Sequence, residues 1–160
     1  RLLHPTAIVA PLWWRIGASL GLMSVFVQCL LGGRMATAWA GQRCLAGGEA
    51  CQLVLSHRLT AMPVVVVVLG FAGAAVLAGG WARQQWPWLG GAVLLVLVQV
   101  ALGVLTLRLG LSQPAVTVAH QLMAALLIAL LAALLVRSPN LPSPSRSVVL
   151  DDTSLEACHG

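Results

Sequence analysis

Two histidines lie inside long apolar stretches of this sequence. His57 follows Cys51 by six residues, and His120 follows Pro114 by six residues. If a helix begins near each of those positions, both imidazoles sit about 9 Å along their helices. Ionisable side chains inside a membrane are usually functional, and two neutral imidazoles at one depth can hold a metal from opposite sides. The alternative is that each histidine only hydrogen-bonds a neighbouring helix.

The number of available ligands favours haem over a bare metal ion. Zinc or copper needs three or four protein ligands, whereas this depth offers no third histidine and no acid, and the nearest cysteine, Cys29, lies in another segment. A haem iron takes four nitrogens from its porphyrin and needs only two axial ligands, which leaves no open position and favours electron transfer. Ala61 and Ala124 share the histidine faces, where small side chains leave room for a porphyrin.

Three polar residues are candidates for the rest of such a pocket. Arg58 follows His57 directly and could pair with a haem propionate, because arginine binds carboxylates bidentately. Its alternative role is to extend towards the lipid headgroups. Gln28 and Gln99 could hydrogen-bond near the haem edge, or serve only as contacts between helices.

The composition places these residues in a membrane. Of the 160 residues, 59% are hydrophobic and only 8% are charged, whereas a soluble domain carries about 25% charged residues. The net charge of +5 comes from nine arginines without a lysine. Because these arginines are scattered and form no basic stripe, the charge does not indicate binding to nucleic acid.

Four segments are long enough to span a bilayer, which takes about 20 helical residues. They cover approximately residues 13–31, 53–78, 89–107 and 115–136. Only helices satisfy the backbone of such segments in lipid, so residues 1–137 are predicted to form an all-α bundle of four transmembrane helices. Residues 138–160 are rich in proline and polar residues at first and then acidic, which predicts a disordered cytoplasmic tail.

An internal repeat divides the chain into two related helical hairpins. The pattern V-Q-x-x-L-G occurs at residues 27–32 and 98–103, and H-x-L-x-A occurs at residues 57–61 and 120–124. Finding both patterns in the same order makes chance an unlikely explanation. We therefore expect two hairpins that face each other across a pseudo-twofold axis, with the two histidines on opposing helices.

The arginines also predict how the chain is oriented. Five lie on one predicted side of the membrane and three on the other: Arg1, Arg15, Arg83, Arg137 and Arg146 against Arg34, Arg43 and Arg108. The positive-inside tendency then places both termini in the cytoplasm. Cys44 and Cys51 fall in the first, outward-facing loop, where a disulfide is the first expectation and two free thiols the alternative.

Longer motifs resemble the haem A synthase family. They are Q-C-L-L-G-G-R-M-A-T at 28–37, followed by the two-cysteine loop, L-S-H-R-L-T-A at 55–61, and G-V-L-T-L-R-L-G-L-S-Q-P-A-V-T-V-A-H-Q-L at 103–122. The resemblance extends to Val136 and concerns the C-terminal half of a family with two pseudo-symmetric four-helix halves.

The resemblance implies a role in a bacterial-type cell membrane. His57 and His120 would ligate haem b, and Cys44 and Cys51 would be the cysteine pair of the loop. The whole enzyme oxidises a methyl group of haem O to the formyl group of haem A for cytochrome oxidase assembly, and the substrate haem and catalytic glutamate belong to the N-terminal half. Because Glu49 is placed in the loop and no acid is expected inside a helix, this chain alone is not expected to catalyse.

Two other functions remain open at this point. One is a stand-alone bis-histidine b-type cytochrome that passes electrons in the membrane without further chemistry. The other is a haem-free membrane assembly factor in which both histidines are structural. A visible spectrum of the purified protein separates the last of these from the haem-binding functions.

Overall fold

The four predicted apolar segments form four long helices in the computed structural model. The structure describes residues 9–37, 40–44, 48–109 and 113–139. Its helices are α1 (Leu12–Thr37), α2 (Ala40–Arg43), α3 (Glu49–Ala78), α4 (Gly80–Gln84), α5 (Trp86–Arg108) and α6 (Pro114–Val136). The helices α1, α3, α5 and α6 are each long and apolar enough to cross a membrane. The prediction of an all-α, multi-pass membrane bundle is confirmed.

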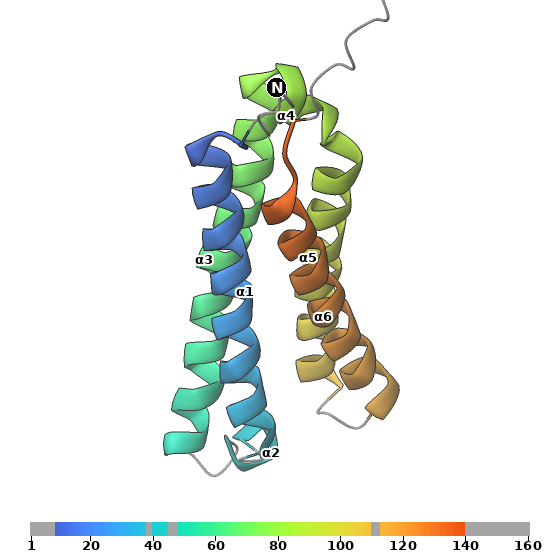
Figure 1. The fold of residues 1–160 in the computed structure, drawn as a ribbon. Coiled ribbons are helices and arrows are strands. Elements are labelled where there is room, and N and C mark those ends of the chain that lie inside the picture. The colour runs from blue at the N-terminus through green and yellow to red at the C-terminus, as the bar shows by residue number, and fades with distance from the viewer. Residues whose placement is uncertain (1–8, 38–39, 45–47, 110–112, 140–160) are drawn as a thin grey trace, which may run out of the picture. The chain divides into compact units, whose positions relative to one another are not determined.

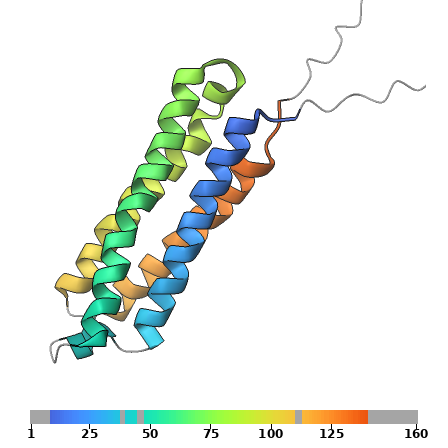
Figure 2. The ribbon, with the colours of Figure 1, turned by 90° about the vertical axis from the view of Figure 1, so that its left-hand side faces the viewer.

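The long helices form a closed ring of contacts. Helix α1 lies along α3, and α5 lies along α6, which gives the two hairpins expected from the repeat (Figure 1). Contacts between α1 and α6 and between α3 and α5 join one hairpin to the other (Figure 2). Helices α3 and α6 therefore occupy diagonal positions. The compact unit extends from Ala10 to Arg137, whereas the predicted disordered tail lies almost entirely outside the described residues.

The first two connections between the long helices are more helical than the sequence analysis predicted. Helix α1 continues six residues past its predicted end at Leu31, because in lipid a continuing helix satisfies backbone groups that Gly32 and Gly33 would otherwise leave open. The segment between α3 and α5 is also mostly helical. There α3 ends where Gly79 and Gly80 adopt positive φ angles of 68° and 52°, which glycine does without steric cost, and α4 follows at once.

Trp14 holds the ends of three helices together. Its indole N–H donates a hydrogen bond of 2.9 Å to the Leu134 carbonyl oxygen of α6. Its ring packs edge-on against Phe71 of α3, with centroids 4.9 Å apart, and lies 4.8 Å from the ring of Trp81 in α4. Gly17, one turn further along α1, leaves the space that the Phe71 ring occupies, since a Cβ there would lie 2.5 Å from it.

The end of α6 is attached to α5 in a similar way. The Arg137 guanidinium donates a hydrogen bond of 2.6 Å to Oε1 of Gln85 and lies 4.0 Å above the Trp88 ring. Gln85 is buried. This cation–π contact and the hydrogen bond fix the end of the bundle that carries Trp14.

Replacing Trp14 is expected to weaken the bundle far more than replacing its neighbour. The Trp14 side chain is 0% exposed, whereas Trp13 is 38% exposed. Trp14→Ala should lower the free energy of unfolding by about 3–5 kcal/mol, as is usual for a buried tryptophan, and Trp13→Ala should have little effect. Thermal unfolding of both variants in detergent, followed by circular dichroism, measures this. Equal midpoints for the two variants would contradict the account of the packing.

Candidate functional site

The two intramembrane histidines lie on the diagonal helices. His57 is in α3 and His120 is in α6, and each of these helices packs against both α1 and α5. Both imidazoles are half-buried. The bundle therefore places the two histidines, 63 positions apart in the sequence, on helices that share the neighbours α1 and α5.

Their depth along the helices differs slightly from the prediction. Helix α6 begins at Pro114, as expected, but α3 begins at Glu49 and not near Cys51. By the rise of a helix, His57 lies about 12 Å along α3 and His120 about 9 Å along α6. Glu49 is thus the exposed first residue of a helix and not a loop residue, which corrects the sequence analysis. It remains at the end of α3 and not at the depth of the histidines.

A glycine of the preceding long helix contacts each imidazole. A Cβ at Gly32 would lie 3.1 Å from Cε1 of His57, and a Cβ at Gly103 would lie 3.3 Å from Cε1 of His120. These are the last residues of the two V-Q-x-x-L-G patterns. The repeat therefore builds the same contact in both hairpins, with the Cε1 edge of each ring against a helix that has no side chain there.

Gln28, one turn before Gly32, holds His57 by several hydrogen bonds. Its Nε2 donates to the His57 carbonyl oxygen at 2.7 Å and lies 3.2 Å from Nδ1 and 3.5 Å from Nε2 of the ring. The Thr60 hydroxyl lies 2.7 Å from Oε1 of Gln28 and 2.7 Å from the Ser56 carbonyl oxygen, and it has one proton to donate to either of them. These hydrogen bonds join α1 to α3 at His57, and the predicted place of Gln28 at the edge of a haem stays a prediction.

The second hairpin has the same glutamine without the same hydrogen bonds. His120 lies next to the Gln99 backbone, but Nδ1 of His120 and Oε1 of Gln99 are both buried without a hydrogen-bond partner among the described residues. Met123 occupies the position that corresponds to Thr60 in the repeat. The second hairpin therefore offers no hydroxyl at the position from which Thr60 contacts Gln28. This threonine was not recognised from the sequence, although the mismatch within the repeat could have indicated it.

The half of the bundle that contains the histidines has no apolar core. Every buried residue of the four long helices lies in the other half, in the ranges 14–25, 64–75, 89–96 and 124–134. None of the described side chains at 26–36, 49–63, 97–108 or 114–123 is buried. The buried side chains of the four long helices therefore gather around Trp14 and not at the level of the imidazoles.

The remaining predicted site residues surround the pair to different degrees. Ala124 is buried at the edge of the core and Ala61 is half-buried, both one turn after a histidine. Arg58 is exposed beside His57. Cys29 is a half-buried free thiol in α1. Among the described residues it forms no group of three possible metal ligands with the histidines.

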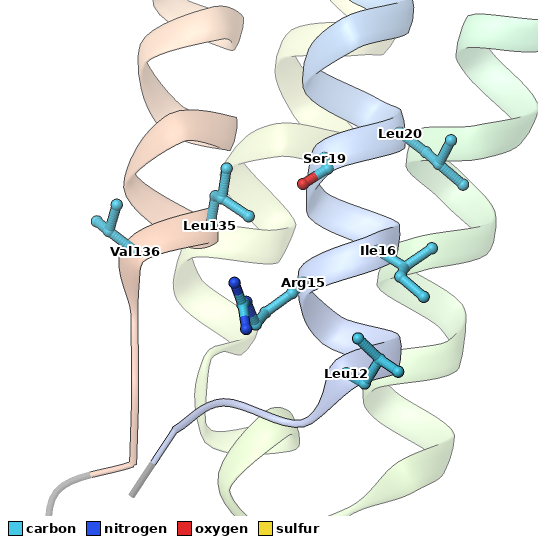
Figure 3. A pocket seen from close by; sticks show the side chains of 7 residues that line it. All are labelled: Leu12, Arg15, Ile16, Ser19, Leu20, Leu135 and Val136. Atoms are coloured by element: carbon cyan, nitrogen blue, oxygen red, sulfur yellow. The ribbon is translucent and has the colours of Figure 1, made fainter. Parts of the chain in front are cut away.

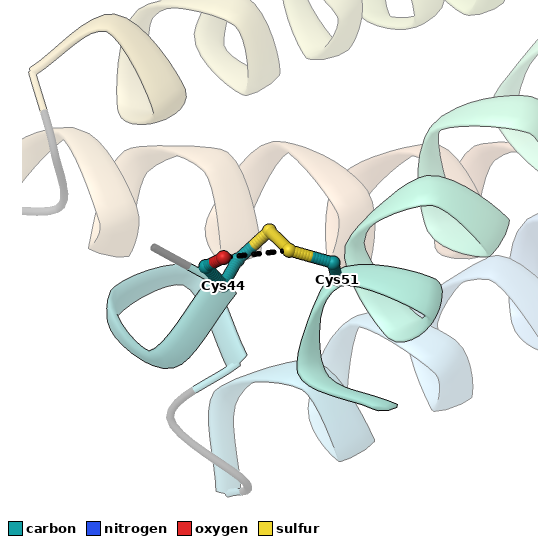
Figure 4. The surroundings of a disulfide bond; sticks show 2 residues. All are labelled: Cys44 and Cys51. Atoms are coloured by element: carbon teal, nitrogen blue, oxygen red, sulfur yellow. Dashed lines mark hydrogen bonds between the residues drawn. A yellow bond between two sulfur atoms is a disulfide. The ribbon is translucent and has the colours of Figure 1, made fainter. Parts of the chain in front are cut away.

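A disulfide joins Cys44 to Cys51, as predicted. It links the residue after α2 to the first turn of α3, and Sγ of Cys51 lies 2.7 Å from the Cys44 carbonyl oxygen (Figure 4). Because His57 follows Cys51 by six residues in the same helix, the disulfide helps to fix the start of the helix that carries His57.

Two grooves lie on the surface of the bundle, and neither is lined by a histidine. One of about 580 Å³ lies between α1 and α6, where Arg15 and Ser19 are set among apolar side chains (Figure 3). A second, of about 350 Å³, lies between α1 and α3 and is apolar except for Gln28, Thr60 and Ser24.

Among the described residues, no three histidine, cysteine or acid side chains come together as a metal site. The imidazoles of His57 on α3 and His120 on α6 are the candidate metal ligands considered below.

Comparison with known proteins assigns no family. No protein-family model, curated protein or solved structure matches this chain. The functional assignment therefore depends on the histidine pair and its surroundings.

The contact between glycine and histidine can be tested with a matched pair of variants. Gly32→Ala places a methyl group against Cε1 of His57, whereas a Cβ at Gly33 meets nothing within 4 Å. We expect the Cε1–H resonance of His57 in [13C]histidine-labelled protein to shift in Gly32→Ala and to stay in place in Gly33→Ala. Similar shifts in both variants would contradict the contact.

Proposed function

We propose that this chain binds one haem b between α3 and α6 and transfers electrons within the membrane. His57 and His120 are the axial ligands. The observation that carries the proposal is that two histidines on diagonal helices each lie against a glycine of the preceding long helix, in the half of the bundle where no described side chain of the long helices is buried.

The surrounding residues suit this cofactor. The glycines at 32 and 103 let each imidazole lie against a helix backbone, and Ala61 and Ala124 keep the neighbouring turns small. When bound, haem cycles between its ferric and ferrous states. Two histidines occupy both axial positions and exclude other ligands, and Arg58, exposed beside His57, pairs with a propionate.

More specifically, we propose that the chain is the C-terminal, electron-transferring half of a haem A synthase. The family-like motifs around both histidines and the disulfide between the loop cysteines support this. Its partner is a second four-helix half that holds haem O as substrate. A general base must lie within hydrogen-bond reach of the proton it takes. In the described part of this chain the one acid is Glu49, at the exposed start of α3 and away from the level of the histidines. We therefore assign the general base to the partner half.

We also propose that the chain lies in a bacterial-type cell membrane with the disulfide outside and both termini in the cytoplasm. The arginine distribution and the persistence of disulfides in oxidising compartments support this orientation.

The axial ligands are tested by spectroscopy of the purified protein. Replacing either His57 or His120 with alanine should remove the low-spin bands of the reduced haem, because each variant lacks one axial ligand. His159→Ala is the control, since this histidine lies in the predicted tail and should leave the spectrum unchanged. Persistence of the low-spin spectrum in both intramembrane variants would refute the ligand assignment.

The requirement for a second, substrate-binding half is tested by measuring the conversion of haem O to haem A by chromatography. Purified protein supplied with haem O and an electron acceptor should form no haem A, because its two intramembrane histidines are already used by one haem and no acid lies at their depth. Adding a candidate N-terminal half should restore conversion. Haem A formed by this chain alone would point to Glu49 as a catalytic residue and would overturn the proposed division of labour.

The orientation is tested by labelling intact cells with a membrane-impermeant thiol reagent. Cys44 and Cys51 should react only after reduction and from the outside, because they form a disulfide in an outward loop. Cys44→Ser should expose one reactive thiol at Cys51 without reductant. Labelling that requires access from the cytoplasm would mean that the orientation is inverted.

A further inference from the structure

The groove between α1 and α6 contains a charged side chain that has no partner in the described part of the chain. Arg15 and Ser19 point from α1 towards α6, with Leu135 of α6 beside them (Figure 3). Arg15 is exposed, and its guanidinium makes no hydrogen bond or ion pair with a described residue. Arg137, at the end of α6, is by contrast hydrogen-bonded to Gln85. Arg15 is therefore the cation that this groove offers to a ligand.

The Ser19 hydroxyl is also available to a ligand. Ser24, Ser56 and Thr106 each donate a hydrogen bond to a carbonyl oxygen of their own helix, which is a usual way to satisfy a hydroxyl group inside a membrane helix. The half-buried Ser19 makes no hydrogen bond with a described residue. It follows Arg15 by four residues, so both side chains share one face of α1, and Ser19 lies about 6 Å further from the start of the helix.

Apolar side chains form the two edges of the groove. Leu12, Ile16 and Leu20 of α1 lie on one side, and Leu135 and Val136 of α6 lie on the other (Figure 3). Between 50% and 80% of the surface is exposed for all of these residues except the half-buried Leu135, so the described chain leaves the edges open to lipid. The volume of about 580 Å³ is within the range of roughly 300–1,000 Å³ that is usual for small-molecule sites.

Exposed tryptophans mark the end of the bundle that carries Arg15. Trp13, Trp86 and Trp88 are all exposed there, and tryptophans gather at the interface between a membrane and water. They indicate that this end lies at the depth of the lipid headgroups. Arg15 is three residues from the start of α1, which is about 4.5 Å along the helix. A phosphate bound by Arg15 is then at the depth of the phosphates of the surrounding lipids.

The charges at this end favour an anionic lipid over a zwitterionic one. Arg15, Arg83 and Arg137 lie there, whereas the one acid of the described residues, Glu49, lies at the far end of α3. A guanidinium binds a phosphate bidentately whichever lipid carries it. The ammonium group of phosphatidylcholine would meet arginines and no described carboxylate, and phosphatidylglycerol has no such group. A second copy of the described residues, inserted in the same direction, likewise offers Arg15 no carboxylate at this depth.

We propose that the groove between α1 and α6 is a binding site for one anionic phospholipid. Arg15 binds the phosphate, Ser19 donates a hydrogen bond to an ester oxygen of the glycerol, and an acyl chain lies along Ile16, Leu20 and Leu135. Basic pockets between transmembrane helices are suited to anionic headgroups in this way. The proposal goes beyond the haem function and does not depend on it, because no histidine lines the groove.

The preference for an anionic lipid is tested by native mass spectrometry of the purified full chain. The chain is titrated with phosphatidylglycerol or with phosphatidylcholine that carries the same acyl chains. We expect the first phosphatidylglycerol to bind about fivefold more tightly, the preference that one arginine near a membrane surface gives. Arg15→Gln should abolish this preference. Arg83→Gln is the matched control and should keep it, because Arg83 is exposed at the same end of the bundle and does not line the groove.

The position and the source of the ligand are tested in the same titration. Ser19→Trp fills the groove and should weaken the binding of both lipids, and inorganic phosphate at millimolar concentration should not displace phosphatidylglycerol. Equal affinities of the wild type for the two lipids, equal losses in Arg15→Gln and Arg83→Gln, or unchanged binding in Ser19→Trp would overturn the proposal. Displacement by inorganic phosphate would assign the site to a free anion instead. A chain that purifies as a dimer and binds lipid only after dissociation would assign the groove to a second copy, and the proposal would fail.

Discussion

The packing of Trp14 is the interaction on which the rest of the bundle depends. This one side chain hydrogen-bonds the end of α6 and makes an edge-on contact with Phe71 of α3 and a tilted contact with Trp81 of α4. Between helices in lipid there is little hydrophobic driving force, so close packing and hydrogen bonds between helices determine their arrangement. With Arg137 bound to Gln85 and Trp88, the two hairpins are joined at one end of the unit.

This arrangement leaves the other half of the bundle available for a site. The buried residues of the long helices stop before the level of the histidines, and the groups found there are imidazoles, carboxamides and glycines. Buried polar atoms without partners, such as Nδ1 of His120, reduce stability and are expected mainly where function requires them. The proposed haem site accounts for two histidines at this level of the bundle, where no described side chain of the long helices is buried.

Much of the fold follows from the sequence, and part of the site does as well. Lipid permits only helices for such apolar segments, so even the ends at Ala78 and Val136 agree with the prediction. The repeat identified equivalent positions but not which helix faces which, and so the contact of Gly32 with His57 was not predicted. The contact of Thr60 with Gln28 joins side chains of two helices, which spacing alone does not specify. Its replacement by Met123 within the repeat was nevertheless visible in the sequence.

The most direct test of the central claim is a titration of haem into the purified haem-free chain, followed by electron paramagnetic resonance of the ferric form. The account predicts saturation at one haem per chain and a low-spin signal typical of two imidazole ligands. A high-spin signal, a stoichiometry other than one, or a low-spin signal that survives the removal of both His57 and His120 would contradict it.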